Sequence, residues 1–345
     1  IDNDYCGEHL NHDPKTTTRE RILCPYDLSH TVYKDDLEDH LKHKCNSRPQ
    51  PNPPYFSLNI NCTFPIPEKD EKLTLSELSK ETLEKLIYNV NNWFDKLGLQ
   101  ISTLVLDHDA LREKREILKN GKHAIQQASL LGHMARLDLL KPDGCFVEFG
   151  SGKGELSYFT KLAIKDDEGK STFILIDRKN TRCKFDSGIR KISDKRSTVR
   201  RIGIDIKDVD FSKLDLIKDK RIVAYSKHLC GSATDVTLRS LVNYVKFEKE
   251  SKEPVSGIII ALCCHQLCQY HMYPNQEYLR EIGITESDFK GICAMSSWAI
   301  CGQRSNHDDN KSGEHEENNS NENDDVEDIG EHAYYDFDDT KQVGQ

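Results

Sequence analysis

A run of alternating glycines stands near the middle of the 345-residue chain. Glycines at every second position let a backbone turn sharply and approach a ligand closely, and the helix that follows offers free N–H groups. The spacing is neither the G-x-G-x-x-G of a dinucleotide site nor that of a P-loop, which needs Lys followed by Ser or Thr. The turn therefore predicts a site for a different cofactor. Its sequence is Val147-Glu148-Phe149-Gly150-Ser151-Gly152-Lys153-Gly154-Glu155-Leu156-Ser157.

An acid followed by such glycines resembles the first motif of class I S-adenosylmethionine-dependent methyltransferases. In that family the acid orients the methionine part of the cofactor, and the glycine backbone lies beneath it. Two later acids stand where the resemblance expects them: Asp177, at the ribose hydroxyls, and Asp205, near the adenine amino group. A solvated loop with two ordinary acids is the simpler interpretation, but three signals in order favour a cofactor site. The resemblance implies cofactor binding by Glu148, Gly150, Gly152, Gly154, Asp177 and Asp205.

Basic side chains follow two later apolar runs. Lys227 and His228 come after residues 222–225, and His265 comes after residues 257–262. Carboxyl ends of parallel strands face the ligand, and methyl transfer to a hydroxyl needs a group that takes or orients its proton. Histidine titrates near neutral pH, and lysine does so when burial lowers its pKa. The three are candidate catalytic residues, although each could be hydrogen-bonded in place and chemically idle.

Cysteines are frequent, with twelve in the chain. No secretory signal opens the sequence, so we expect thiols or metal ligands in an intracellular compartment, cytoplasmic or nuclear, and not disulfides. Cys263 and Cys264 are adjacent and are not expected to face one metal. Small buried side chains are the preferred interpretation there, with a metal site as the alternative.

A second group of Cys and His lies near the N-terminus. Cys24, His30, His40 and Cys45 supply two thiolates and two imidazoles, which satisfy tetrahedral zinc. A segment this small has too little core to fold without a metal. His43 stands close to Cys45 and is left open as an alternative ligand. A loop with incidental Cys and His is the simpler interpretation.

Five short apolar runs alternate with helical or loop segments, a pattern typical of a parallel sheet with crossover helices. The runs are 145–149, 173–176, 199–206, 222–225 and 257–262. Helical spacing of apolar residues predicts helices within 74–97 and over about 122–140, and a short helix over 34–44. The expected fold is α/β, a Rossmann-like class I methyltransferase domain behind a small zinc-finger module.

Charge is unevenly distributed along the chain, whose net charge is −10. Residues 307–339 hold fourteen Asp and Glu against one Lys, so the remainder carries +3. Residues 305–345 are polar and acidic and are expected to be disordered. Residues 178–201 hold ten Lys and Arg, which suits an RNA backbone, although a solvated helix face fits equally well. No apolar run reaches the length of a membrane span.

Together these features resemble the eukaryotic tRNA 2′-O-methyltransferases that modify nucleotide 4 of the acceptor stem. The family's SKHLCGxATD string is found from Ser226 to Asp235, and its ALCCHH-x-C string from Ala261 to Cys268. Its CHHC-finger pattern CPxDxxHxVxxxxLxxH begins at Cys24. The resemblance implies S-adenosylmethionine and zinc as cofactors and tRNA as the substrate.

The resemblance also implies a domain order. Cys6-Gly7-Glu8-His9 looks like the end of a CCCH finger, whose upstream cysteines are absent. The expected parts are a CCCH remnant at 1–14, a CHHC finger at 20–47, a Pro- and Asn-rich linker at 48–68, a methyltransferase domain at 69–304 with a helical lead-in at 69–143, and the acidic segment at 305–345.

The chain departs from the family pattern at several points. Four residues, and not the usual three, separate His40 from Cys45, and Gln266 replaces the second His of the CCHH string. Five strands are found where a class I domain has seven. Our hypothesis is that the sequence is a fragment of a longer protein.

Two other classes of function fit parts of the sequence. One is a non-catalytic zinc-finger RNA-binding protein with a relict methyltransferase fold, against which the intact acids and glycines argue. The other is a methyltransferase that acts on protein or on a small molecule. Catalysis distinguishes the first alternative from a tRNA methyltransferase, and substrate choice distinguishes the second.

Overall fold

The computed structural model divides the chain into two compact units, residues 1–54 and 55–345, which are described separately. The expected CCCH remnant and the expected acidic segment lie outside the described residues. No helix in the described part is both long enough and apolar enough to cross a membrane. The described residues are 20–45, 47–48, 52–63, 66–67, 73–98, 100–117, 121–178, 181, 185–192, 197–249 and 253–297.

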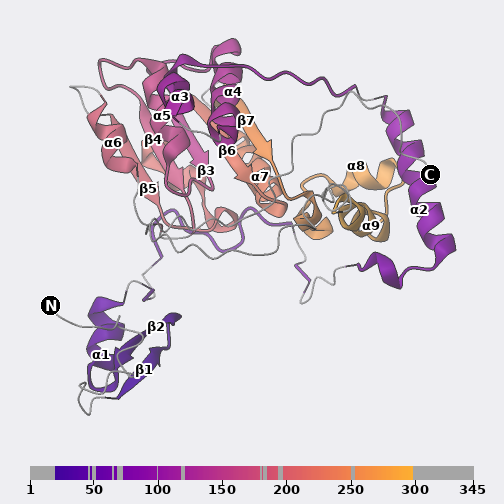
Figure 1. Ribbon diagram of the computed structural model, residues 1–345, viewed down its shortest axis with the longest axis horizontal. Coiled ribbons are helices and arrows are strands. Elements are labelled where there is room, and N and C mark those ends of the chain that lie inside the picture. The colour runs from indigo at the N-terminus through magenta and orange to yellow at the C-terminus, as the bar shows by residue number, and fades with distance from the viewer. Residues whose placement is uncertain are drawn as a thin grey trace, which may run out of the picture. The chain divides into compact units, whose positions relative to one another are not determined.

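The smaller unit is a β-hairpin followed by a helical segment (Figure 1). Its elements are β1 (Arg21–Cys24), β2 (Asp27–Tyr33), the 3₁₀-helix η2 (Lys34–Asp36), α1 (Leu37–Asp39) and the π-helix η3 (His40–Lys44). The two strands pair antiparallel. Among the described residues, the buried core consists of Cys24, Val32 and Cys45, with Leu37 and Leu41 packed against it. A core this small needs a crosslink or a metal to hold it.

The larger unit contains a sheet with helices on both faces (Figure 1). Its strands are β3 (Cys145–Phe149), β4 (Thr172–Ile176), β5 (Thr198–Ile202), β6 (Ile222–Leu229) and β7 (Val255–Leu262). Its α-helices are α2 (Lys80–Leu97), α3 (Arg112–Ile117), α4 (Lys122–Arg136), α5 (Glu155–Ile164), α6 (Asp186–Lys191), α7 (Ser232–Phe247), α8 (Gln276–Glu281) and α9 (Glu286–Ser296). Its 3₁₀-helices are η4 (Leu75–Glu77), η5 (Asp109–Leu111), η6 (Ile206–Asp208), η7 (Phe211–Lys213), η8 (Asp215–Ile217), η9 (His265–Leu267) and η10 (Tyr270–Met272).

The five strands form one parallel sheet in the order β5-β4-β3-β6-β7. The chain moves outward from β3 to β5 and then returns to place β6 on the other side of β3. This Rossmann-like order confirms the predicted fold class. It also creates a switch point between the carboxyl ends of β3 and β6, which is where such sheets bind ligands.

Alternate residues of the central strand face two different cores, as the two-residue period of a strand requires. Val147 belongs to the core beneath α7, and Phe146 belongs to the core beneath α4 and α5. Every residue of β3 and β4 is buried, and that is typical of a parallel sheet covered on both faces. The three-layer packing holds the carboxyl ends of these strands in fixed positions.

Several element ends differ from the sequence prediction. The third strand ends at Ile202 and not at residue 206, because the chain turns and Asp205 caps η6 through a hydrogen bond from the Lys207 N–H. The first long helix begins at Lys80, and the second ends at Arg136. The predicted order of elements is unaffected.

Part of the expected linker packs against the larger unit. Phe56 forms an isolated β-bridge with Val209. The buried Asn61 amide donates to the carbonyls of Ile206 and Val209 at 2.7 and 2.8 Å. A composition rich in Pro and Asn predicts a linker over 48–68, but here the side chain of Asn61 satisfies backbone carbonyls in the segment that follows β5. The connecting segment is therefore shorter than its composition indicates.

Candidate functional site

The glycine turn between β3 and α5 adopts a left-handed backbone. Gly150, Gly152 and Gly154 have φ angles of 61°, 48° and 83°, which side chains disfavour. A Cβ on Gly154 would lie 2.5 Å from Leu175, whereas one on Gly152 would meet no described atom within 4 Å. The turn is therefore packed beneath Gly154 and open at Gly152, as cofactor binding requires.

Both predicted strand-end acids lie at this edge of the sheet. The Gly152 N–H donates to Asp177 Oδ2 at 2.7 Å, which joins the end of β4 to the open part of the turn. Asp205 Oδ2 lies 3.9 Å from Arg178 Nη1, while its Oδ1 caps η6. Carboxylates at such strand ends are suited to ribose and base contacts.

Glu148 is buried beneath the turn and is only 4% exposed. Its Oε2 accepts hydrogen bonds from the N–H, at 3.1 Å, and the hydroxyl of Ser157. The Ser157 hydroxyl also lies 2.6 Å from the Tyr225 hydroxyl. Burial raises the pKa of Glu148 to about 7. This carboxyl therefore ties β3 to the first turns of α5, and its contact with a cofactor stays a prediction.

Arg201 on β5 holds the underside of the glycine turn. Its guanidinium donates to Gly152 O at 2.8 Å and Ser151 Oγ at 3.0 Å, and it pairs with Asp186 at 2.7 Å. The Arg201 side chain is 12% exposed. Arg201 belongs to the basic segment 178–201 that was predicted to contact RNA, but its guanidinium hydrogen bonds are made to the glycine turn.

We expect Arg201→Ala to weaken S-adenosylmethionine binding by about tenfold or more, because the change removes the guanidinium that donates to the Gly152 carbonyl and the Ser151 hydroxyl of the turn. Calorimetric titration with the cofactor measures the effect. Arg200→Ala is the matched control, since Arg200 is exposed on the same strand. Equal losses of cofactor affinity in the two variants would contradict the assignment.

Lys227 lies near the end of β6, close to the first turn of α5. Burial is the main cause that lowers its pKa to about 8; the charge of Lys114 adds to this effect and that of Glu155 opposes it. Glu155 follows the glycine turn directly and is held by Lys114 Nζ at 2.7 Å and Gln127 Nε2 at 2.8 Å. A lysine with this pKa is partly neutral near physiological pH and can accept a proton.

His228 faces His123 of α4, with ring centroids 5.7 Å apart. Partial burial, and then the charge of Lys227, lowers the pKa of His228 to about 4, so this ring is neutral at pH 7. His228 has a φ of 63°, a conformation that is rare in residues with a side chain and is concentrated at functional sites. His265 is exposed on η9, after β7. Lys227 and His228 thus share one cluster with His123.

Cys230 and Cys263 form a disulfide between the loop after β6 and the end of β7. The expectation of free thiols is wrong for this pair, because β6 and β7 are neighbours and bring two distant segments together. The sulfurs of Cys230, Cys263 and Cys264 lie within 4.8 Å of one another. Adjacent cysteines therefore do face one point, since the backbone leaves the extended conformation at Cys264.

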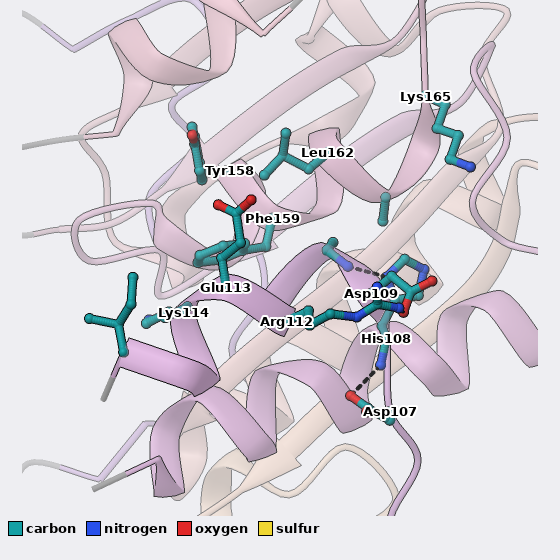
Figure 2. Close-up of a pocket in the computed structure, with 13 residues that line it drawn as sticks. Asp107, His108, Asp109, Arg112, Glu113, Lys114, Tyr158, Phe159, Leu162 and Lys165 are labelled. Carbon is teal, nitrogen blue, oxygen red and sulfur yellow. Dashed lines mark hydrogen bonds and ion pairs between the residues drawn. The ribbon is translucent and has the colours of Figure 1, made fainter. Parts of the chain in front are cut away.

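A separate cavity of about 1180 Å³ lies beside α3 and α5 (Figure 2). Arg112 pairs there with Asp109, and Lys114 lies 5.1 Å from the Phe159 ring centre. None of the predicted site residues lines the cavity, which adjoins the cluster around Lys227 through Lys114. Its lining residues are Asp107, His108, Asp109, Ala110, Arg112, Glu113, Lys114, Ile117, Tyr158, Phe159, Leu162, Ala163 and Lys165.

In the smaller unit, the four predicted zinc ligands converge. Ligand atoms of Cys24, His30, His40 and Cys45 lie within 4.8 Å of one another. The two sulfurs are 3.6 Å apart, and the two Nε2 atoms 3.1 Å apart. Tetrahedral zinc with bonds of about 2.3 Å to sulfur and about 2.05 Å to nitrogen needs separations of about 3.8 and 3.3 Å. The donor set and its spacing therefore fit zinc.

The π-helix explains the extra residue before Cys45. The Cys45 N–H donates to His40 O at 2.7 Å, five residues back, so a widened turn accommodates the four intervening residues. His43 is exposed and lies outside the ligand cluster. Asp27 Oδ2 lies 3.5 Å from His30 Nδ1, which leaves Nε2 directed at the cluster. Geometry thus favours His40 over His43.

We expect His40→Ala to remove one zinc equivalent and to unfold residues 20–45, because the unit's core is too small without a metal. His43→Ala is the matched control and should retain both the zinc and the fold. Metal content and limited proteolysis of the two variants measure the difference. Loss of zinc in His43→Ala with retention in His40→Ala would reverse the assignment.

Two family models match this chain. The family model described as Methyltransferase TRM13 matches residues 125–336, and that of the U11-48K-like CHHC zinc finger matches residues 21–46. The chain belongs to the TRM13 methyltransferase family. No solved structure matches it.

Relatives of this TRM13-family chain are named tRNA:m(4)X modification enzymes. The mouse protein is 39% identical over 87% of this chain and 70% of its own length. The human protein is 38% identical over the same shares. The Debaryomyces hansenii protein is 36% identical over 91% of this chain and 74% of its own length.

Several residues near Lys227 were not predicted from the sequence. Lys114, His123 and Glu155 lie near Lys227 but come from α3, α4 and α5, and Gln127 of α4 donates to Glu155. Glu155 directly follows Gly154, and this position is the one sequence feature that could have indicated its place at the site. The others are separated by long stretches of sequence and carry no motif.

Proposed function

We propose that this chain transfers the methyl group of S-adenosylmethionine to the 2′-hydroxyl of nucleotide 4 in the tRNA acceptor stem. The observation that carries the proposal is the pairing of an open glycine turn with a half-buried lysine at the switch point of the sheet. The names of the relatives support tRNA and position 4. The resemblance described above supports the ribose oxygen.

The residues at the turn fit the cofactor. Gly152 leaves open space, and Asp177 and Asp205 present carboxylates at the adjoining strand ends. When bound there, S-adenosylmethionine supplies an electrophilic methyl group. Arg201 keeps the turn in its binding conformation from below.

Lys227 is the proposed acceptor of the hydroxyl proton. Its neutral amine can take the proton, and Glu155 then faces the ammonium that forms. The neutral ring of His228 can orient the hydroxyl by accepting a hydrogen bond. His265 lies on η9, directly after β7, and is the third candidate.

The zinc finger and exposed cations are the proposed RNA contacts. Zinc held by Cys24, His30, His40 and Cys45 would fix the smaller unit in its fold. Within 178–201, Arg190, Lys191 and Arg200 are exposed and available to phosphates. Their binding should weaken steeply as salt concentration rises.

Transfer of labelled methyl groups tests the proposal. A full-length version of the protein is given unmodified tRNA, whole-cell protein and labelled S-adenosylmethionine. We expect label on tRNA. Label on protein with none on tRNA would favour the alternative methyltransferase class, and label on neither, with the cofactor bound, would favour the relict RNA-binding protein.

A further inference from the structure

We infer that Cys230, Cys263 and Cys264 form a second metal site, a three-thiolate site for a soft divalent cation such as Zn²⁺ when the Cys230–Cys263 disulfide is reduced. The site belongs to the larger unit and is separate from the CHHC cluster. It does not depend on the identity of the methyl acceptor.

Three sulfurs from two distant parts of the chain converge on one point. Cys230 comes from the loop between β6 and α7, and the other two follow β7. All three sulfurs lie within 4.8 Å of one another, as do the four ligand atoms of the CHHC cluster. Cys264 is buried, with 9% of its surface exposed, and the other two are half-buried. Ligand atoms are thus close together and largely shielded from water.

The two loops that carry these cysteines are packed tightly against each other. A Cβ on Gly231 would lie 2.4 Å from the carbonyl oxygen of Leu267, so the backbones approach as closely as glycine permits. Ser232 Oγ donates to Leu267 O at 3.4 Å. The loops are therefore held together independently of the sulfurs, and the three ligands are pre-positioned.

Thiolates determine which cation the site would take. Soft sulfur ligands select Zn²⁺ over Mg²⁺ or Ca²⁺, which prefer oxygen. A dithiol reductant transfers two electrons and two protons to the Cys230–Cys263 disulfide and is itself oxidised to a disulfide. Zn²⁺ then displaces one proton from each of the three thiols and keeps one coordination position for water.

A metal at this point would act on the methyltransferase site through the backbone. Cys230 stands two residues after His228 and three after Lys227, at the end of the same strand. Its Sγ atom lies 3.5 Å from the His228 carbonyl oxygen. Metal binding would therefore fix the end of β6 against the end of β7, next to the proposed catalytic cluster.

Metal content of the reduced full-length chain tests the inference. The protein is stripped of metal, reduced with a dithiol, loaded with Zn²⁺ and desalted. We expect Cys264→Ser and Cys230→Ser each to bind one equivalent less than the unchanged chain. Cys268→Ser, four residues beyond Cys264 and outside the cluster, is the matched control and should lose none.

Substitution with cobalt gives an independent readout of the ligands. The sulfur-to-cobalt charge-transfer absorption should fall in Cys264→Ser while the absorption from the CHHC cluster remains, and thermal unfolding of each variant checks its fold. Unchanged zinc content in both serine variants would overturn the inference. The inference would also be overturned if the total zinc bound by the unchanged chain equalled the amount of zinc lost in His40→Ala, because no zinc would then remain for the second site.

Discussion

Lys227→Met should lower the rate of methyl transfer by about 10²- to 10⁴-fold, which is the typical contribution of a positioned general base. Cofactor affinity should change less than the rate, since the proposed cofactor contacts are the glycine turn, Asp177 and Asp205 and not Lys227. Single-turnover transfer of labelled methyl groups to tRNA measures the rate. Lys122→Met is the matched control, because Lys122 contributes positive charge to the same cluster.

The pH dependence of the rate distinguishes a role of Lys227 as proton acceptor from an effect of its positive charge alone. Burial lowers the pKa of Lys227 to about 8, so roughly a tenth of it is neutral at pH 7 and the neutral fraction rises with pH. The rate should therefore rise up to about pH 8 and then level off. Lys122→Met should keep this profile. A flat profile in the unchanged chain, or equal rate losses in the two variants, would show that Lys227 is not the base.

Asp177→Ala should weaken S-adenosylmethionine binding by about 100-fold while the domain stays folded. Two losses combine: the Gly152 N–H loses its acceptor at the open part of the turn, and the ribose hydroxyls lose a charged acceptor. A 100-fold loss of affinity corresponds to about 2.7 kcal/mol of binding free energy. This is within the range of a single charge-assisted hydrogen bond, which contributes about 1.5–3 kcal/mol. Titration calorimetry measures the affinity, and thermal unfolding checks the fold.

Asp177→Asn is the informative control for this carboxylate. It keeps the shape and one acceptor oxygen but removes the charge, so we expect an affinity between those of the unchanged chain and Asp177→Ala. Cofactor affinity equal to that of the unchanged chain in Asp177→Ala would refute the ribose assignment.

The predictable parts of this structure are those in which short segments carry their own signal. Alternation of apolar runs and helices predicts the five strands, because each run must be buried in a covered sheet. The glycine turn and Asp177 are predictable for the same reason, since strand ends of a parallel sheet meet at one edge. The exact end of β5 is not, because Asp205 caps a turn only in the folded context.

The unpredicted parts depend on contacts between distant segments. Arg201 lies in a run of cations, and only its burial against Asp186 and Gly152 O assigns it to the glycine turn. The Cys230–Cys263 pair requires β6 and β7 to be neighbours. The structure distinguishes His40 from His43 because residues His40–Lys44 form a π-helix. One extra residue in the spacing does not predict that helix type.

Mapping the methyl group on tRNA tests the central claim most directly. A 2′-O-methyl ribose lacks the hydroxyl that attacks the neighbouring phosphate in alkali, so the labelled nucleotide remains in an alkali-resistant dinucleotide. Labelled S-adenosylmethionine and unmodified tRNA are incubated with a full-length version of the protein, and the tRNA is then hydrolysed and sequenced. We predict label only in a resistant dinucleotide that begins at nucleotide 4. Label on a base, or on a ribose elsewhere in the tRNA, would contradict the claim.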